Sequence, residues 1–365
     1  MSRLKELLGY AVKKGASDVH LTVGSPAACR IDGQITFFGN GDLAPKDTIS
    51  FLDELMDANQ KEDFYRRGDA DLALSISGLG RFRVNCMRQR GSVGIVLRHV
   101  RGKILPFAEL NLPAGMDRIA KMKRGLCLVT GTTGSGKSTT LASIIDRINE
   151  TRSEHIITIE DPIEFLHSNK KSIVTQREVT IDTKNFETAL RACLREDPDV
   201  ILIGEMRDAE TFHAAVSAAE TGHLVFSTLH TTNVMLTIDR IMDMFPSAQH
   251  DQVRSQLSQQ LKACVAQRLV PAANKKGRVP AIELMFMNPG IASLIREKQI
   301  RQIPNAIAAG KEDGMQSFNT SLVQHVKAGL VTEADAMDFS DNPEELKMNL
   351  QGIYLSSGKG GILKR

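Results

Sequence analysis

The sequence predicts an α/β protein in which a smaller α+β domain precedes a domain with a mainly parallel sheet. From residue 126 onward, continuous apolar strands alternate with helix-compatible segments, which is typical of a parallel sheet covered on both faces. Before residue 100, short strands follow one another with glycine turns between them, which favours an antiparallel sheet. The chain has 365 residues and 42% hydrophobic content, enough for two folded cores.

The composition excludes several classes of protein. A net charge of +3 is too small to require a nucleic acid or an anionic membrane as partner. The five cysteines are odd in number and scattered, with no C-x-x-C pair, so neither a zinc site nor a disulfide framework is expected. Reduced thiols fit the cytoplasm. There is no apolar run of about eighteen residues and no signal peptide, so we expect no integral membrane segment.

Local patterns predict the elements of an N-terminal domain over residues 1–100. The helices are expected at 4–12 and 47–56, and the strands at 18–23, 30–37 with a hairpin turn at Asp32-Gly33, 70–76, 81–86 and 92–100. The next segment, 101–113, contains Gly102, Pro106 and Pro113 and no clear period, so it is predicted to be a linker. The second domain is expected to occupy residues 114–365.

Arginine is frequent near the end of the N-terminal domain. The arginines concerned are Arg81, Arg83, Arg88, Arg90, Arg98 and Arg101. Three interpretations are open: a solvated sheet face, a nucleic-acid surface, or arginines that reach a nucleotide on a neighbouring subunit. Only Phe82 interleaves the run, so base stacking has little support. On residue types alone, the solvated face is favoured.

The strongest motif lies at the start of the second domain. An apolar strand at 126–129 leads into a glycine-rich loop and then a helix, with the spacing G-x-x-x-x-G-K-S of a P-loop. The residues expected to bind the nucleotide are Gly131, Thr132, Thr133, Gly134, Ser135, Gly136, Lys137, Ser138 and Thr139. Glycines let backbone N–H groups turn toward phosphate oxygens, and the helix N-terminus adds partial positive charge. The lysine reaches phosphates, and Ser138 can ligate Mg²⁺.

Three later strands are expected to end beside this loop. They are predicted at 155–160, 200–205 and 224–229, with helices at 186–195 and 209–220. Because ligands bind beyond the carboxyl ends of parallel strands, the polar residues at those ends are candidate site residues. They are Glu160, Asp161 and Glu164 after the first strand, Glu205 after the second and His230 after the third.

The candidate roles follow from residue type. Gly204 stands where a Mg²⁺-binding aspartate usually follows such a strand, so Glu205 is the expected general base. Glu164 is the competing base, and Glu160 or Asp161 is expected to hold the metal's water shell. His230 lies at the phosphate end of its strand. His223 lies at the other end, where it is expected to be farther from the phosphates of its own subunit.

Together these motifs resemble the secretion ATPases of bacterial type II and type IV pilus systems, most closely the twitching-motility, pilus-retraction ATPases. The resemblance rests on GTTGSGKST (131–139), ITIEDPIEF (157–165), LREDPDVILIGEMRD (194–208) and ETGHLVFSTLHT (220–231), with SDVHL (17–21) and GLGRFRVN (78–85) nearer the N-terminus. It covers nearly the whole chain. In this family a glycine before the Walker B glutamate is normal.

The resemblance implies a cytoplasmic homohexamer at the inner-membrane face of a pilus machine. Each subunit is expected to have a PAS-like N-terminal domain and a RecA-like ATPase domain, to use ATP and Mg²⁺, and to contact an inner-membrane pilus platform protein and no nucleic acid. It also implies that Glu164 belongs to an acidic box, and that His223 and His230 form a histidine pair. The arginine-finger candidates are Arg81, Arg83, Arg98, Arg101 and Arg240.

Retraction is favoured over pilus assembly. The assembly relatives carry an extra N-terminal domain and a cysteine quartet, and this chain has neither. GIASLIRE (290–297) and GMQSFNTSL (314–322) resemble the C-terminal signature of retraction ATPases, but Ala292 and Ser293 replace the usual arginine and asparagine. An accessory paralogue therefore stays open, and the segment also fits a plain amphipathic helix. Beyond residue 340 a short helix and a disordered tail are expected.

Overall fold

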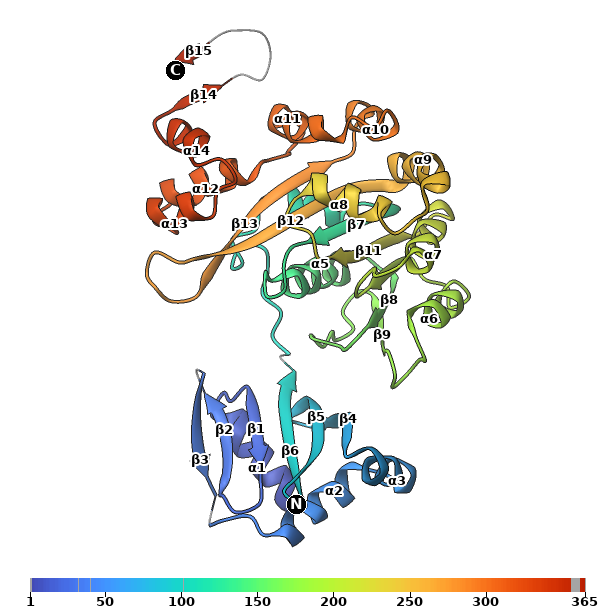
Figure 1. The fold of residues 1–365 in the computed structure, drawn as a ribbon, viewed down its shortest axis with the longest axis vertical. Helices are drawn as coiled ribbons and strands as arrows, with labels where there is room; N and C mark the ends of the chain where they lie inside the picture. The colour runs from blue at the N-terminus through green and yellow to red at the C-terminus, as the bar shows by residue number, and fades with distance from the viewer. Residues whose placement is uncertain (1, 32, 40, 101, 356–361, 365) are drawn as a thin grey trace. The chain divides into compact units, whose positions relative to one another are not determined.

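The computed structural model describes residues 2–31, 33–39, 41–100, 102–355 and 362–364. The chain forms two compact units, drawn from blue to cyan and from cyan to red in Figure 1. The first unit comprises Met1–Lys103 and the short segment Ile163–Leu166, and the second comprises Ile104–Pro162 and His167–Arg365. The division after Lys103 falls within the range 101–113 that the sequence assigns to the linker.

The N-terminal unit is an α+β domain built on a six-stranded sheet. Its elements are α1 (Arg3–Lys13), β1 (Asp18–Leu21), β2 (Ala27–Ile31), β3 (Gln34–Phe38), α2 (Pro45–Leu55), α3 (Ala58–Arg67), β4 (Asp69–Ile76), β5 (Gly80–Gln89) and β6 (Ser92–Val100). The strand order is β3-β2-β1-β6-β5-β4, and every pair is antiparallel. The predicted antiparallel sheet is therefore confirmed.

Local sequence explains most of these elements. The Ser2 side chain caps α1, whose Leu4, Leu8 and Ala11 are buried at helical spacing. Ile31 pairs with Gln34 across the two-residue hairpin that the sequence predicts, although Asp32 itself lies outside the described residues. Helix α3 was not predicted, because it is strongly polar and only Phe64 of its residues is buried.

The second unit holds a seven-stranded sheet. Its first elements are α4 (Gly115–Ala120), β7 (Gly125–Thr130), α5 (Lys137–Thr151), β8 (His155–Glu160), β9 (Ile173–Glu178), α6 (Phe186–Cys193), β10 (Val200–Ile203), α7 (Ala209–Glu220) and β11 (Leu224–Leu229). The remaining elements are α8 (Val234–Met242), η1 (Ser247–Gln249), α9 (His250–Gln260), β12 (Leu261–Pro271), β13 (Arg278–Phe286), α10 (Pro289–Arg296), η2 (Ile300–Gln302), α11 (Ile303–Ala309), α12 (Phe318–Lys327), α13 (Glu333–Asp338), α14 (Pro343–Leu350), β14 (Ile353–Leu355) and β15 (Ile362–Lys364).

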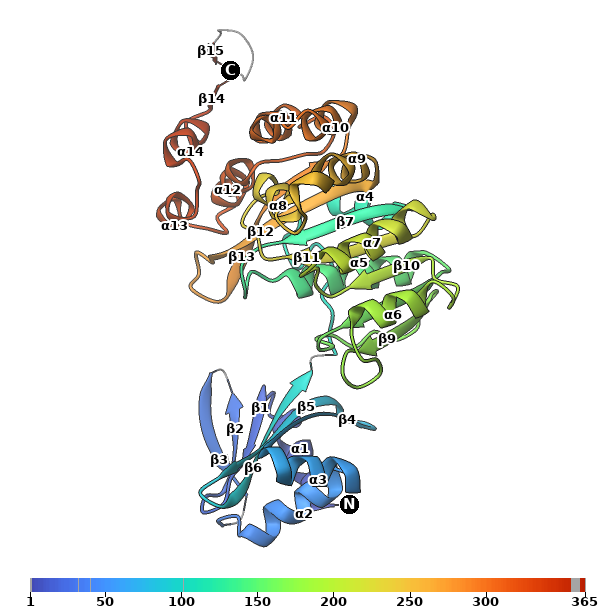
Figure 2. The same ribbon diagram turned by 45° about the vertical axis from the view of Figure 1, so that its right-hand side comes forward.

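The sheet is parallel except at one edge. Its order is β13-β12-β7-β11-β10-β8-β9, and only β13 runs antiparallel to its neighbour. Right-handed crossovers place α5 on one face and α6 and α7 on the other, while α8 and α9 pack against β12 (Figure 2). All residues of β7, β10 and β11 are buried. The predicted α/β class with a mainly parallel sheet is confirmed.

The predictions differ from the structure mainly on the two sides of this sheet. The edge strand β9 was not predicted, because most of its residues are only half-buried and show no clear alternation. The long hairpin of β12 and β13 was not predicted, although β13 is buried along eight of its nine residues. Beyond residue 340 the expected short helix is α14, but the prediction of a disordered tail is wrong for residues 353–355 and 362–364, which pair as the antiparallel strands β14 and β15. Residues 356–361 and 365 lie outside the described residues.

All five cysteines are free thiols, and all are buried. Within the part of the chain that the structure describes, the helices are too short or too polar for any of them to cross a bilayer.

Candidate nucleotide site

The predicted P-loop has the backbone that phosphate binding requires. Gly131, Gly134 and Gly136 have φ angles of 151°, 77° and 89°, a region that glycine enters at little cost. The loop leaves β7 at Thr130 and enters α5 at Lys137. Its N–H groups and the N-terminus of a fifteen-residue helix therefore meet in one place.

Lys137 lies in the middle of this loop. Its side chain is almost fully buried, with 8% of the residue exposed. The Nζ atom donates to the carbonyl oxygens of Gly131, at 2.8 Å, and Thr132, at 3.1 Å. The ammonium is thus already directed into the loop, where phosphate oxygens can take the place of carbonyl acceptors.

The hydroxyl of Ser135 gives an independent sign that the loop is built for a ligand. Ser135 is 4% exposed, and its Oγ atom has no hydrogen-bond partner. A buried hydroxyl without a partner is costly in free energy. A phosphate oxygen is the acceptor that this position lacks, so the residues fit a nucleotide.

A glutamate, a histidine and an arginine meet beyond the ends of β10 and β11. Glu205 Oε1 lies 3.2 Å from His230 Nε2, and Glu205 Oε2 lies 2.9 Å from an Arg207 guanidinium nitrogen. The Glu205 side chain is 21% exposed. The sequence predicted Glu205 and His230 at this edge, and the structure brings them into contact. Arg207 was not predicted, since an arginine four residues beyond a strand has no distinguishing pattern.

The missing aspartate at Gly204 has a steric explanation. A Cβ atom there would lie 3.3 Å from the carbonyl oxygen of Ile159 and 3.4 Å from Cα of Glu160, tighter than ordinary van der Waals contact. The Gly204 N–H donates to the same Ile159 oxygen at 2.8 Å, and its own carbonyl accepts from Thr228 Oγ1 at 2.7 Å. The end of β10 is therefore packed closely between its neighbours, and a side chain at position 204 would require them to shift by a few tenths of an ångström. Glu205 is the first carboxylate after the strand.

The acidic residues after β8 separate into two groups. Glu160 Oε1 accepts from Thr158 Oγ1 at 2.7 Å and from Gln176 Nε2 at 3.2 Å, which fixes its carboxylate at the strand end. Asp161 is exposed and is joined to Pro162 by a cis peptide bond. Glu164 is also exposed, but it belongs to the segment Ile163–Leu166, which groups with the N-terminal unit. The second unit itself therefore holds Glu160, Asp161 and Glu205.

His223 and His230 lie at opposite ends of β11. His223 precedes the strand, and its Nδ1 lies 2.9 Å from the carbonyl oxygen of Ala218 at the end of α7. The six residues of β11 separate the two histidines, which is about 20 Å along an extended strand. Of the two histidines in one chain, His230 lies at the edge of the sheet where the P-loop begins, and His223 lies at the opposite edge.

The arginine candidates that the structure describes lie on three elements, β5, β6 and α8. Arg83 on β5 faces Arg98 on β6 in the antiparallel register, and Arg98 faces Asp18 on β1. Arg98 Nε donates to Asp18 Oδ1 at 2.7 Å, and this guanidinium holds the pKa of the Asp18 carboxyl below its usual range, against the effect of burial. Arg81 lies on the same strand, Arg240 is exposed on α8, and Arg101 lies outside the described residues.

Residues of β12 and β13 that the sequence analysis missed complete the wall of the phosphate loop. A cavity of about 440 Å³ lies against the loop and is lined in part by Thr232, Gln267, Arg268, Arg278, Phe339 and Asp341. Arg268 donates to the carbonyl oxygen of Phe339 at 2.9 Å and to Asp341 at 2.6 Å. Gln267 and Arg268 are more than a hundred positions from the loop, and the pairing of β12 with β7 brings them to it.

Glu283 on β13 carries a buried carboxyl that contacts the start of α8, shortly after His230. It is 7% exposed, and its Oε2 accepts from the backbone N–H of Val234, the first residue of α8, at 2.7 Å. Burial raises the pKa of Glu283 to about 7, and nearby Asp341 adds to the increase, while the Val234 N–H and Arg268 oppose it. The carboxyl therefore anchors the helix that follows His230, and its charge changes near neutral pH.

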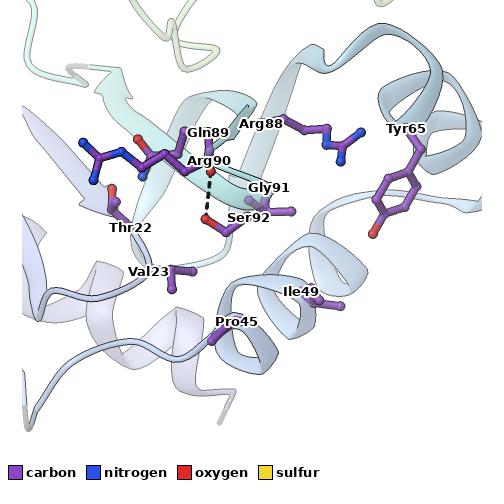
Figure 3. A pocket seen from close by; sticks show the side chains of 11 residues that line it. Thr22, Val23, Pro45, Ile49, Tyr65, Arg88, Gln89, Arg90, Gly91 and Ser92 are labelled. Atoms are coloured by element: carbon purple, nitrogen blue, oxygen red, sulfur yellow. Dashed lines mark hydrogen bonds between the residues drawn. The ribbon is translucent and has the colours of Figure 1, made fainter.

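A larger cavity, of about 770 Å³, lies in the N-terminal unit and is distinct from this site. Figure 3 shows Arg88 and Tyr65 on one side of it and Arg90 on the other. The Ser92 hydroxyl donates to the Gln89 carbonyl oxygen at 3.0 Å and holds the turn between β5 and β6. None of the predicted catalytic or phosphate-binding residues lines this cavity.

Comparison with known proteins identifies the family of this site. A family model described as "Type II/IV secretion system protein" matches residues 1–338. The chain belongs to the type II/IV secretion ATPase family. It is an ATPase, and the resemblance drawn from its motifs is confirmed.

Two curated relatives and one solved structure match almost end to end. The chain is 45% identical over 341 residues to the type IV pilus retraction ATPase PilT of Pseudomonas aeruginosa, covering 93% of this chain and 99% of the relative. It is 41% identical over 347 residues to the type IV pilus ATPase PilU of the same organism, covering 95% and 91%. A crystal structure of the pilus retraction motor PilT with bound ADP superposes with a TM-score of 0.87 at 48% identity, covering 95% of this chain and 99% of that one.

Replacing Glu205 by glutamine is expected to separate ATP binding from hydrolysis. Glu205→Gln keeps the size of the side chain but removes the base, so turnover should fall about 10²- to 10⁴-fold. Binding of ATP should change little, because the phosphate loop is untouched. Steady-state phosphate release and equilibrium binding of a fluorescent ATP analogue measure the two effects. Glu210→Gln, an exposed carboxylate in the first turn of α7, is the matched control. Unchanged turnover in Glu205→Gln would move the base to Glu164.

The buried carboxyl of Glu283 is expected to make stability depend on pH. Its folded-state pKa lies above the ordinary value of 4.5, so the folded protein keeps this proton while the unfolded chain loses it. The resulting contribution to stability is complete below pH 4.5 and is lost as the pH rises toward 7. Glu283→Gln should therefore gain in Tm relative to the wild type between pH 5 and pH 8, measured by thermal denaturation. A Tm difference between Glu283→Gln and the wild type that is constant over this range would contradict the assignment.

Proposed function

We propose that this chain is the motor that retracts type IV pili by hydrolysing ATP. The observation that carries the proposal is the sequence match to PilT, which extends over 93% of this chain and 99% of the relative. The solved structure of a PilT retraction motor also superposes on this chain, with a TM-score of 0.87. The P-loop, Glu205 and His230 are all present at one edge of the parallel sheet. The chain therefore has the parts of an active ATPase, which argues against a scaffold that only binds nucleotide.

The working form that we propose is a homohexamer in the cytoplasm, at the inner-membrane face of the pilus machine. Its proposed partner is the membrane-embedded platform protein of that machine, and no nucleic acid is involved. The segment 101–113 would connect an N-terminal PAS-like domain to the RecA-like ATPase domain. Among ring ATPases of this kind, hydrolysis does mechanical work when nucleotide binding changes how the domains are arranged.

The proposed chemistry is attack of water on the γ-phosphate. Phosphoryl transfer needs positioning and charge neutralisation more than covalent help. The loop N–H groups and Lys137 would hold the phosphates, and Glu205 would orient the water. A carboxylate oxygen can accept two hydrogen bonds. Glu205 can therefore accept from water while His230 and Arg207 hold it in place.

A magnesium ion fits the residues beside the loop. Mg²⁺ prefers oxygen ligands and is usually held by phosphates, waters and one or two protein oxygens rather than by a protein cage. The described residues include no cluster of three His, Cys, Asp or Glu suited to a metal, which agrees with that mode. The Ser138 hydroxyl would be the direct ligand, and Glu160 and Asp161 would bind its waters. The bound ion would neutralise charge on the phosphates.

Among the arginine candidates, we propose Arg83 as the residue that reaches a nucleotide on the neighbouring subunit. Two like charges directly opposite each other on a sheet are destabilising, and Arg83 faces Arg98 in this way. Arg98 is relieved by Asp18, whereas the exposed Arg83 has no carboxylate partner among the described residues. A charge kept at such a cost is more consistent with a function than with an ordinary sheet face.

A second candidate function is an accessory retraction ATPase. It is favoured by the match to PilU, which at 41% identity is nearly as close as the match to PilT. Helix α10 does not distinguish the motor from the accessory ATPase. Ile291 and Ile295 are fully buried and Ala292 is nearly so, so packing against α9 explains the sequence of this helix.

Deletion of the gene is expected to leave long pili that do not retract. The physical reason is that pilin subunits continue to polymerise when the motor that removes them is absent. Fluorescent labelling of pili in living cells measures pilus number, length and retraction events. The deletion strain should be complemented by the wild-type gene and, as a matched control, by the Glu205→Gln variant.

The two candidate functions predict different outcomes for this experiment. Loss of retraction that the wild-type gene restores and Glu205→Gln does not restore supports the motor. Retraction that persists in the deletion strain contradicts the motor and supports the accessory ATPase. Absent pili would contradict both and indicate an assembly ATPase.

A further inference from the structure

Gln267 on β12 contacts the phosphate loop from behind. It is 2% exposed, and both ends of its side-chain amide are used. Its Nε2 donates to the carbonyl oxygen of Ser135 at 2.7 Å, and its Oε1 accepts from the hydroxyl of Thr140 at 2.7 Å. One buried side chain thus joins the loop to the first turn of α5.

The backbone and side chain of Gln267 also explain two glycines of the motif. A Cβ atom on Gly131 would lie 2.5 Å from the carbonyl oxygen of Gln267, and one on Gly136 would lie 2.7 Å from Gln267 Nε2. Both distances are far below van der Waals contact. These glycines are therefore required by the neighbouring strand as well as by their φ angles.

The bond to Ser135 has a consequence for the N–H groups of the loop. In a trans peptide, the C=O of one residue and the N–H of the next point in opposite directions. Holding the Ser135 carbonyl toward β12 therefore directs the Gly136 N–H away from β12. Phosphate binding by such loops depends on the direction of their N–H groups, and Gln267 fixes one of them.

The orientation of the amide is determined by its partners. The Ser135 carbonyl only accepts, so the NH₂ end must face it, and the oxygen end is left for the Thr140 hydroxyl. A methionine or leucine fills similar space but provides neither bond. Strand β12 thus supplies a specific donor to the loop and not only bulk.

We propose that Gln267 is a positioning residue for ATP hydrolysis, which acts by holding the Ser135–Gly136 peptide and the start of α5 in the arrangement that binds phosphate. This inference rests on the ATPase activity of the chain and does not depend on its role in pilus retraction. It predicts an effect on nucleotide affinity. A residue that only stabilised the sheet would change the Tm and leave affinity unchanged.

The test compares two variants of the full-length protein with the wild type. Gln267→Met removes both hydrogen bonds and keeps the length and neutrality of the side chain. The dissociation constant of fluorescent ADP and the KM for ATP should each rise about tenfold, the size expected when a buried carbonyl and hydroxyl lose their partner. The kcat should change much less, because the loop binds phosphates in the ground state and the transition state alike. Thr140→Val removes only one bond and should give a smaller rise, of about threefold.

Asn149→Leu is the matched control. Asn149 is a fully buried amide on the same helix, and it joins the Ser168 carbonyl and the Lys170 N–H at the end of α5 remote from the loop. It should lower the Tm and leave the ADP affinity unchanged. A Gln267→Met protein that behaves like this control would overturn the proposal. If Gln267→Met does not fold, Thr140→Val decides, and unchanged ADP affinity in that variant would overturn the proposal as well.

Discussion

The in-register parallel pairing of β7, β11, β10 and β8 is the constraint on which the site depends. Thr130 lies opposite Leu229, and Ile203 lies opposite both Ser227 and Ile159. Because the strands are parallel, the loops that follow them open at the same edge of the sheet. A shift of one residue would turn every side chain to the other face, so the buried apolar residues of these strands also set the distance between Glu205 and His230.

Close packing of backbone and side-chain atoms at this edge helps to explain why several of its residues are glycines. At Gly204 the limit is the end of β8, and at Gly131 and Gly136 it is Gln267 on β12. The site is therefore tightly supported by neighbouring strands. Such support fixes the direction of the loop N–H groups before a phosphate binds, which lowers the cost of ordering the loop on binding.

The parts of the fold that the sequence predicted are those with a strong local pattern. The bounds of β6, β8, α7 and β11 agree with the prediction residue for residue, because each is an apolar run or an amphipathic period between clear breaks. Helix α3 was not predicted because its sequence is polar and only one of its side chains is buried. The β12–β13 hairpin was not predicted because strands that are buried on both faces show no alternation of apolar and polar residues.

The functional site also has parts that the sequence predicted and parts that it did not. The P-loop and the strand ends could be predicted, because each is a motif of consecutive residues and the parallel topology brings the motifs together. Gln267, Arg207 and Glu283 could not be predicted. Gln267 and Glu283 act through single hydrogen bonds to backbone atoms that lie 132 and 49 residues away along the chain. Nothing in the local sequence of a strand indicates which distant carbonyl or N–H will face it.

A crystal structure with ADP and aluminium fluoride, which mimic the transferring phosphoryl group, tests the central claim most directly. The account predicts the β-phosphate within the loop 131–139 and an in-line water within hydrogen-bonding distance, about 3 Å, of the Glu205 carboxylate. It also predicts that His230 remains beside Glu205. A water held by another carboxylate such as Glu164, with Glu205 paired only to His230 and Arg207, would contradict it.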